Sequence, residues 1–364
     1  MPLNAEELRH AIVGSLLGTA VGDALGLPCE GLNKRRQARI YPALDGHRFF
    51  FGKGMFSDDT EHTAMVAQAL LVAGGDVSRF EDSLAWRFRL WLLGIPAGIG
   101  FATLRAIIKL WFGFGLQRSG VFSAGNGPAM RSAIVGAAYA DTLETIAALV
   151  RASTRITHTD DKAYEGALFV AVAAALATQD QGAGNITPNS FVECLSHFRS
   201  EELTNTETEF MAAINCIAES VNRQESTEEF AVALGLENGV SGYVLHTVPI
   251  ALHAWLSHQT DYASAVLSVI RCGGDTDTSA AIVGGIVGAG VGPKGIPDKW
   301  LDDLIDWPRS RSWLERLGDA LAKAVEQGVP AKNISLLVPA LLIRNVFFII
   351  IVLFHGFRRI LPPY

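Results

Sequence analysis

Residues 272–290 read CGGDTDTSAAIVGGIVGAG and combine an acidic turn with a run of small and apolar residues. Asp275 and Asp277 are two positions apart, so on a regular helix they would not share a face. The glycine pair before them lets the backbone form a turn at this point. The two carboxylates and the hydroxyls of Thr276 and Thr278 are oxygen ligands of the kind that Mg²⁺, Mn²⁺ or Ca²⁺ takes. Asp and Thr are also normal helix N-caps, so this stretch alone leaves a metal site and a cap as alternatives.

A second acidic stretch, Phe56-Ser57-Asp58-Asp59-Thr60, precedes an apolar-periodic helix predicted over 61–73. Adjacent carboxylates repel each other when ionised, and a nearby cation would relieve that repulsion. Two such stretches in one chain favour a shared dinuclear metal site at helix N-termini. They lie over 200 residues apart, so only tertiary packing can bring them together. We expect the small-residue helix after the first stretch to let the second one approach.

Glycines recur at every fourth position along a helix predicted over residues 5–22 and capped by Asn4. They are Gly14, Gly18, Gly22 and Gly26. Each glycine inside a helix costs roughly 1 kcal/mol relative to alanine, so four on one stripe predict another backbone in close contact. Asp23 and Glu30 lie near the end of this helix.

A glycine-rich loop at residues 120–131 precedes another predicted helix. Its Ser123, Gly125, Asn126 and Gly127 would allow backbone amides to face an anion such as a phosphate, although many ordinary loops have this composition. His158 lies in a polar Thr-His-Thr-Asp-Asp turn, where a ligand contact and a structural role are both open. The sequence has neither a P-loop nor a strand-associated GxGxxG motif, which excludes those two nucleotide-binding folds.

The composition is that of a folded globular protein. The 364 residues are 49% hydrophobic and 18% charged. The net charge is −7, and residues 331–364 contain four basic residues and no acid, so residues 1–330 carry −11. An acidic body argues against nucleic-acid binding. The four cysteines are scattered, which indicates a reducing compartment, and the N-terminus lacks a signal-peptide pattern, so we expect a cytoplasmic protein.

No segment shows the period-two alternation of a strand, so the chain is predicted to be all-α. We expect a single orthogonal multi-helix domain over residues 1–330 with its polar motifs at helix starts. Residues 31–56 are expected to be a loop. Further helices are predicted over 78–93, 101–112, 129–152 (broken near Asp141), 162–178, 190–199, 206–221, 226–235, 243–256, 261–270 and 309–326.

The tail, residues 331–364, is unusual because Ser335–Phe354 is almost entirely apolar. A run of about 20 residues could span a bilayer. Pro339, Arg344 and Asn345 interrupt it, and an arginine near the bilayer centre is costly. A membrane span, a peripheral anchor, an oligomer contact and a poorly packed terminus remain open for this segment.

Together these motifs resemble the ADP-ribosylglycohydrolase family, which includes the dinitrogenase reductase-activating glycohydrolase. The resemblance covers roughly residues 8–325 and rests on ordered, widely spaced segments. They are Gly18–Gly26 with Glu30, Ser57–Thr60, Gly125–Arg131, Thr157-His158 and Gly273–Thr278. Ser57 stands where many relatives have Thr, and the hydroxyl is kept. The tail lies outside the family pattern.

The resemblance implies an all-α fold with two Mg²⁺ or Mn²⁺ ions. By matching position, the metal ligands would be Ser57, Asp58, Asp59, Asp275, Asp277 and Thr278. The catalytic residues would be Glu30, Asp58, Asp59 and Asp275, with Glu30 orienting or activating water. ADP-ribose would contact Ser123, Gly125, Asn126, Gly127, Met130 and His158.

The implied activity is metal-dependent hydrolysis of the bond between ADP-ribose and a protein side chain, most of all arginine, which reverses mono-ADP-ribosylation. Serine linkages and ADP-ribose esters are alternatives within the same family. A non-catalytic ADP-ribose-binding relative and a neutralising partner of an ADP-ribosylating toxin are alternatives from other classes. The expected partners are therefore a mono-ADP-ribosylated protein and a cognate ADP-ribosyltransferase, with membrane contact through the tail also open.

Overall fold

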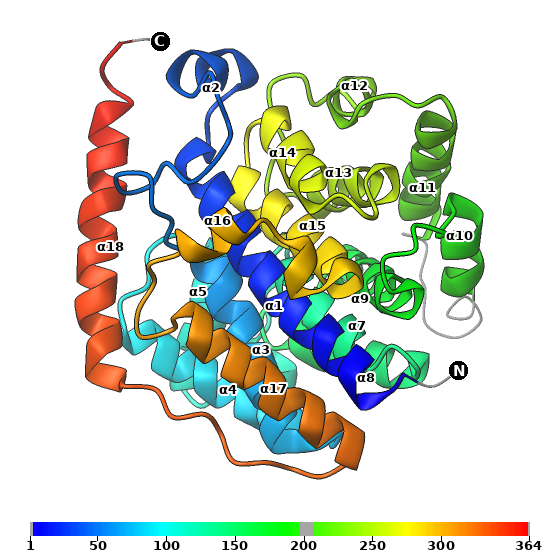
Figure 1. Cartoon of the computed structure of the whole chain (residues 1–364). Helices are drawn as coiled ribbons and strands as arrows, with labels where there is room; N and C mark the ends of the chain where they lie inside the picture. The colour runs from blue at the N-terminus through cyan, green and yellow to red at the C-terminus, as the bar shows by residue number, and fades with distance from the viewer. Residues whose placement is uncertain (1–2, 197–206, 363–364) are drawn as a thin grey trace.

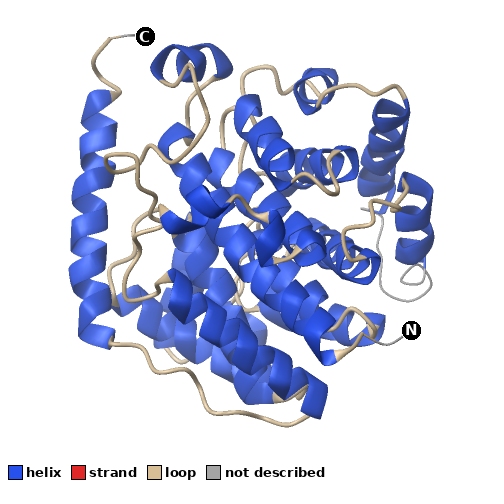
Figure 2. Cartoon of the chain, in the orientation of Figure 1, coloured by secondary structure: helices blue, strands red, loops and turns tan. Residues whose placement is uncertain are grey.

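The computed structural model describes residues 3–196 and 207–362. This part of the protein is built from α-helices (Figures 1 and 2). Pairing between extended segments in this part of the chain is limited to isolated bridges. The all-α prediction is therefore confirmed. The α-helices are α1 (Ala5–Gly26), α2 (Lys34–Ile40), α3 (Asp58–Ala73), α4 (Val77–Leu93), α5 (Phe101–Trp111), α6 (Leu116–Ser119), α7 (Ala133–Ala138), α8 (Leu143–Arg155), α9 (Asp161–Asp180), α10 (Pro188–Ser196), α11 (Glu207–Asn222), α12 (Thr227–Ala233), α13 (Val244–Ser257), α14 (Tyr262–Cys272), α15 (Thr276–Val291), α16 (Asp298–Asp302), α17 (Arg311–Gln327) and α18 (Val338–Arg358). Short 3₁₀ helices cover Leu27–Cys29, Ala129–Arg131 and Pro293–Gly295.

Helices α1 and α15 pack against each other at the centre of the molecule. A Cβ atom at Gly14, Gly18 or Gly22 would lie 2.1 Å from a carbonyl oxygen of α15, and one at Gly26 would lie 2.4 Å from another. The glycine stripe therefore lets the two backbones touch, as predicted. The prediction that the small residues of α15 let the Ser57–Thr60 segment approach is wrong, because these residues face α1. Gly284 and Gly288 lie against the carbonyl oxygens of Gly18 and Gly14.

Most predicted helix bounds agree with the structure to within two residues, although α3 begins at Asp58 and not at residue 61. The predictions over 190–199 and 206–221 reach residues 197–206, which lie outside the described residues. The Asn4 side chain accepts hydrogen bonds from the backbone of Glu6 and Glu7, which caps α1. Helix α1 continues to Gly26, because the glycine stripe stays in contact with α15 over that extra turn. The prediction of a loop over 31–56 is wrong at α2, whose first turn is capped by the Asn33 side chain.

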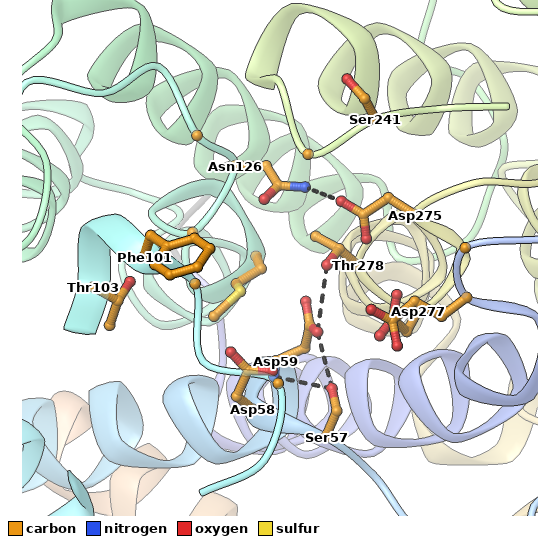
Figure 3. A pocket seen from close by; sticks show the side chains of 18 of the residues that line it. Ser57, Asp58, Asp59, Phe101, Thr103, Asn126, Ser241, Asp275, Asp277 and Thr278 are labelled. Carbon is orange, nitrogen blue, oxygen red and sulfur yellow. Dashed lines mark hydrogen bonds between the residues drawn. The ribbon is translucent and has the colours of Figure 1, made fainter. Parts of the chain in front are cut away.

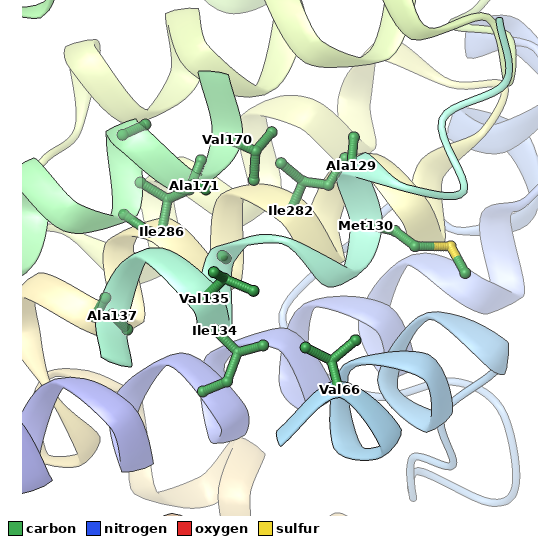
Figure 4. Packing of buried hydrophobic residues seen from close by; sticks show 14 of the residues in the cluster. Val66, Ala129, Met130, Ile134, Val135, Ala137, Val170, Ala171, Ile282 and Ile286 are labelled. Carbon is green, nitrogen blue, oxygen red and sulfur yellow. The ribbon is translucent and has the colours of Figure 1, made fainter. Parts of the chain in front are cut away.

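The core around α7 brings together side chains of α3, α9 and α15 (Figure 4). Ile134 and Val135 of α7 are fully buried, between α3 and the pair formed by α9 and α15. A Cβ atom at Gly136 would lie 1.9 Å from the carbonyl oxygen of Ala171 in α9, so a second pair of helices packs backbone to backbone. Close packing of this kind fixes the helix ends that carry the polar motifs.

Helix α18 lies along one side of the body (Figure 1). In the described residues, two helical segments are long and apolar enough to cross a membrane, Ala5–Cys29 and Pro339–Arg358. The most apolar 18-residue window of the first is entirely buried in the core, whereas 28% of the corresponding window of the second is buried. Arg344 and Asn345 face the body, with exposed fractions of 5% and 3%. The polar residues that interrupt the apolar tail therefore serve to dock it.

Candidate active site

Every predicted site residue lines a single pocket of about 600 Å³ (Figure 3). The pocket lies where the start of α3, the loop before α7 and the start of α15 meet. Its lining includes Glu30, Ser57, Asp58, Asp59, Ser123, Gly125, Asn126, Gly127, Met130, His158, Asp275, Asp277 and Thr278. Tertiary packing thus brings together the segments that the sequence keeps far apart.

Asp275 follows a glycine turn and stands at the N-cap position of α15, but its side chain does not cap the helix. Gly273 and Gly274 have φ angles of 72° and 82°, which favour glycine. A Cβ atom at Gly274 would also lie 2.0 Å from the carbonyl oxygen of Val240. The Asp275 side chain makes no cap hydrogen bond to the described start of α15, and instead accepts one from Asn126 Nδ2 at 2.7 Å. The cap alternative is therefore wrong for Asp275.

Ser57 is the N-cap of α3, which leaves the two following carboxylates for another use. Its hydroxyl accepts a hydrogen bond from the Asp59 backbone N–H at 3.4 Å and donates one to Asp59 Oδ2 at 3.0 Å. Asp23 of α1 holds the same turn, because its carboxylate accepts from the backbone of Ser57 and from the backbone and hydroxyl of Thr60. The sequence predictions did not include this role of Asp23.

The two acidic stretches meet through Thr278, whose hydroxyl donates to Asp59 Oδ2 at 3.4 Å (Figure 3). Oδ1 of Asp59 and Oδ1 of Asp277 are buried and have no hydrogen-bond partner among the described residues. A buried carboxylate oxygen without a partner is costly. Such oxygens in a shared pocket are suited to act as ligands of a bound cation.

The carboxylates of this pocket disfavour one another's ionisation. Burial, and then the charges of neighbouring acids, raise the pKa values of Asp58, Asp59 and Asp277 well above the ordinary range. Burial also raises the pKa of Glu30, and the charge of Asp275 adds to the effect. The pKa of Asp23 is raised to about 6 by burial, against the lowering effect of its hydrogen bonds.

A divalent metal fits the chemistry of these residues, although the described part of the chain holds no group of three or more His, Cys, Asp or Glu side chains arranged to bind one. Carboxylate and hydroxyl oxygens are the ligands that Mg²⁺ and Mn²⁺ prefer. A bound cation would pair with the buried oxygens that lack described partners, and it would reduce the mutual repulsion of the acids. The residues that would hold it are Ser57, Asp58, Asp59, Asp275, Asp277 and Thr278.

The glycine loop is shaped by His158. Cβ atoms at Gly125 and Gly127 would lie 3.1 Å from the His158 ring, so these glycines leave room for the imidazole. The Asn126 backbone N–H donates to the carbonyl oxygen of Gly242 at 3.0 Å. The prediction that the loop amides face an anion is therefore wrong for Asn126, whose side chain instead orients Asp275.

His158 is buried and uncharged. Its exposed fraction is 3%, and its Nδ1 lies 2.9 Å from the hydroxyl oxygen of Thr157. Burial and the positive charge of Arg131 lower the pKa of His158 to about 3. The imidazole can therefore contact a ligand by hydrogen bonding but brings no positive charge to a phosphate.

Several further pocket residues were absent from the sequence predictions. Phe101 and Thr103 belong to α5, and Ser241 lies in the loop before α13. Phe348 and Val352 belong to α18 in the tail. The glycine-rich stretch before Phe101 is the one local signal that could have pointed to α5, whereas the tail residues carry no polar signal at all.

Comparison with known proteins identifies the family. The sequence profile of the ADP-ribosylglycohydrolase family matches residues 4–330. This chain belongs to the ADP-ribosylglycohydrolase family. The tail beyond residue 330 lies outside the match.

Individual relatives agree with the family match. An uncharacterised protein of Archaeoglobus fulgidus is 32% identical over 87% of this chain and 96% of its own length. The ADP-ribosylhydrolase ARH3 of Gallus gallus is 28% identical, over 79% of this chain and 87% of its own. The ADP-ribosyl-[dinitrogen reductase] glycohydrolase of Rhodospirillum rubrum is 27% identical, over 83% and 92%. A solved ADP-ribosylglycohydrolase-related protein complex superposes with a TM-score of 0.63 at 26% identity, over 88% of this chain and 99% of that chain.

The chain is therefore a glycohydrolase that acts on ADP-ribose linkages. Members of this family act on ADP-ribosylated protein substrates and are in general metal-dependent. The pocket described above is concave and lined by several carboxylates.

Proposed function

We propose that the enzyme releases ADP-ribose from mono-ADP-ribosylated arginine side chains, with two Mg²⁺ or Mn²⁺ ions held between Ser57–Asp59 and Asp275–Thr278. One observation carries this proposal: the two acidic stretches share one pocket and leave the Oδ1 atoms of Asp59 and Asp277 buried without described partners.

The residues suit cleavage of a glycosidic bond at the anomeric carbon of a ribose. Such cleavage passes through an oxocarbenium-like transition state, and nearby carboxylates stabilise its positive charge. Bound divalent ions would supply coordination of the ribose hydroxyls and acidify the attacking water. Glu30 is suited to accept a proton from that water, because its carboxylate lines the same pocket.

Asn126 and Ser57 are positioning residues for this step. The Asn126 amide donates to Asp275 Oδ2 and also to the Thr247 hydroxyl, so it fixes the orientation of that carboxylate. The Ser57 hydroxyl holds Asp59 from the opposite side of the pocket. We assign the ADP-ribose contacts to the Ser123–Met130 loop and His158, which line the same pocket.

A second candidate is hydrolysis of serine-linked ADP-ribose. The similarity to ARH3 enzymes over much of the chain favours it, since the family includes members that act on serine linkages. The two candidates are separated by incubating the full chain with arginine-, serine- and O-acetyl-linked ADP-ribose, each with Mg²⁺, Mn²⁺ or a chelator. Metal-dependent release from arginine supports the first proposal, and release from serine alone supports the second.

Asp275→Ala should abolish hydrolysis while leaving the fold intact. Wild-type turnover by this variant with metal present would refute the proposed site. ADP-ribose binding by the wild-type chain with no hydrolysis of any of these linkages would support a non-catalytic relative, which the intact set of acidic residues disfavours.

Location and partners are separate proposals. We propose a cytoplasmic enzyme, on the basis of its scattered cysteines, and cell fractionation tests this. Recovery in the membrane fraction would instead favour an anchor made by the outward apolar face of α18. A role in neutralising a toxin requires a cognate ADP-ribosyltransferase, which co-purification would detect.

A further inference from the structure

We propose that the tail helix α18 is part of the active site, with Arg344 positioning the acidic start of α3 and with Phe348 and Val352 forming a wall that selects the substrate. This inference rests on the proposed function, and it concerns a segment that lies beyond the family match.

Arg344 and Asp306 together clamp the residue before Ser57. Arg344 donates through Nε and Nη2 to the Asp306 carboxylate at 3.1 and 2.5 Å. Arg344 also donates to the carbonyl oxygen of Phe56, while Asp306 Oδ2 accepts the Phe56 N–H at 3.3 Å. The backbone N–H and C=O of Phe56 are therefore both held by one buried ion pair, directly before the predicted ligands Ser57, Asp58 and Asp59.

A second link joins Arg344 to α3 at Glu61. Arg344 Nη1 lies 3.6 Å from Glu61 Oε1, which also accepts from Arg309 at 2.5 Å. The other oxygen of Glu61 accepts from Trp91 Nε1 at 2.5 Å. Arg344 thus holds the first turn of α3 on both sides of the acidic pair, from a helix more than 270 residues away. Groups that act through such fixed geometry can change rates strongly without touching the substrate.

Phe348 and Val352 form the wall. They follow Arg344 at four-residue intervals, so all three lie on the same face of α18. Both line the pocket, alongside Leu27 and Ala97. The Arg344 guanidinium lies 4.3 Å from the centre of the Phe348 ring, which joins the wall to the clamp. The same face of α18 therefore carries both Arg344, which contacts the start of α3, and the two apolar side chains that line the pocket.

The far end of α18 is fixed to the segment that carries Glu30. Arg359 donates to the carbonyl oxygen of Pro28 at 3.2 Å. His355 Nε2 lies 2.8 Å from the carbonyl oxygen of Phe49, whose ring packs on Phe348 at 5.1 Å. The helix is held at both ends by the segments that deliver the site residues, as expected of a structural part of the pocket.

The wall limits what can enter beside the acidic residues. A large side chain in a pocket wall discriminates by bulk, and a difference of one or a few carbon atoms changes specificity by about tenfold or more. We therefore assign to Phe348 a preference for compact or flexible ADP-ribosylated acceptors over a bulky, folded protein surface.

The clamp is tested with full-length Arg344→Met and Arg344→Lys, and with Arg358→Met as the matched control on the exposed end of α18. Thermal unfolding selects folded variants. Arg344→Met should lower kcat by about 30-fold with little change in KM, and weaken Mn²⁺ binding by about tenfold in calorimetry without substrate. Arg344→Lys should recover part of both losses, and Arg358→Met should match the wild type. Wild-type kcat and Mn²⁺ affinity in a folded Arg344→Met variant would overturn the assignment.

The wall is tested independently with Phe348→Ala against Phe354→Ala, whose side chain is 68% exposed on the same helix. For Phe348→Ala, kcat/KM for an ADP-ribosylated folded protein should rise by about tenfold relative to that for the small ADP-ribosyl amino acid. Phe354→Ala should leave this ratio unchanged. An unchanged ratio in Phe348→Ala rejects the wall even if Arg344→Met fails to fold. If the wild type hydrolyses nothing, the proposed function fails, and Mn²⁺ and ADP-ribose binding by the same variants still decide the role of α18.

Discussion

The Thr278 hydroxyl donates to the Asp59 carboxylate at 3.4 Å, although the two residues are 219 positions apart. This contact joins the starts of α3 and α15, each of which contributes buried carboxylates to the pocket. The two acidic stretches therefore line one pocket, which neither stretch provides alone.

Asp277→Asn tests whether Asp277 serves catalysis and not the stability of the fold. The change keeps the shape of the side chain and removes a carboxylate whose ionisation is disfavoured by burial and by the charges of Glu30, Asp275 and Asp59. We expect hydrolysis to fall by about 10²–10³-fold, the scale of a lost charge-stabilising group. The melting temperature in chelator should stay constant or rise, because the repulsion is relieved. Initial rates and thermal unfolding measure the two effects.

The matched control is Asp298→Asn, which removes an exposed carboxylate from α16. It should leave both rate and melting temperature unchanged. A large loss of stability for Asp277→Asn in chelator would show that Asp277 is a structural residue and not a ligand.

Gly18→Ala tests the contact between α1 and α15. The new Cβ atom would meet the Gly284 carbonyl oxygen at 2.1 Å, so the backbones must separate. Overpacking of this kind should lower the free energy of unfolding by about 3 kcal/mol, as measured by urea denaturation. Gly100→Ala is the control, because nothing lies within 4 Å of its Cβ position. Equal stability of the two variants would contradict backbone contact.

Asp23→Asn tests whether α1 positions the start of α3. An amide cannot accept all the hydrogen bonds that Ser57 and Thr60 donate to the carboxylate. We expect about 2 kcal/mol of lost stability and a fall in kcat. Thr60→Val removes only the 2.6 Å hydroxyl contact and should have the smaller effect on both. The reverse order would exclude the positioning role of Asp23.

His253 should make the protein less stable in mild acid. Burial lowers its pKa to about 4, so between that value and 6.5 the unfolded chain binds more protons than the folded one. Its contribution is fully present above pH 6.5 and is lost as the pH falls towards 4, amounting to about 2 kcal/mol at pH 5 relative to pH 8. His253→Gln should remove that part of the pH dependence. Identical pH profiles of unfolding for the two proteins would contradict a depressed pKa.

The sequence predicts well the features that depend on local chemistry. The four-residue glycine spacing predicted backbone contact, and the paired acids with hydroxyls marked the helix starts that meet in the pocket. It predicts poorly the features that depend on a distant partner. Nothing in the local sequence shows that α15 meets α1, that Asn126 holds Asp275, or that His158 occupies the space left by the loop glycines.

The tail shows the same limit most clearly. Arg344 in an apolar run argued against a membrane span, but its ion pair with Asp306 could not be inferred, because it depends on how α18 docks. The contribution of Phe348 to the pocket was equally hidden, since a phenylalanine among apolar residues has no distinguishing pattern.

Electron paramagnetic resonance of the Mn²⁺-loaded full chain tests most directly that the two acidic stretches form one dinuclear site. Metals in such sites lie about 3.5–4 Å apart and are magnetically coupled. The wild type should bind two ions with a coupled spectrum, and Asp59→Asn and Asp277→Asn should each abolish the coupling. A single uncoupled ion in the wild type, or coupling that survives both substitutions, would contradict the shared site.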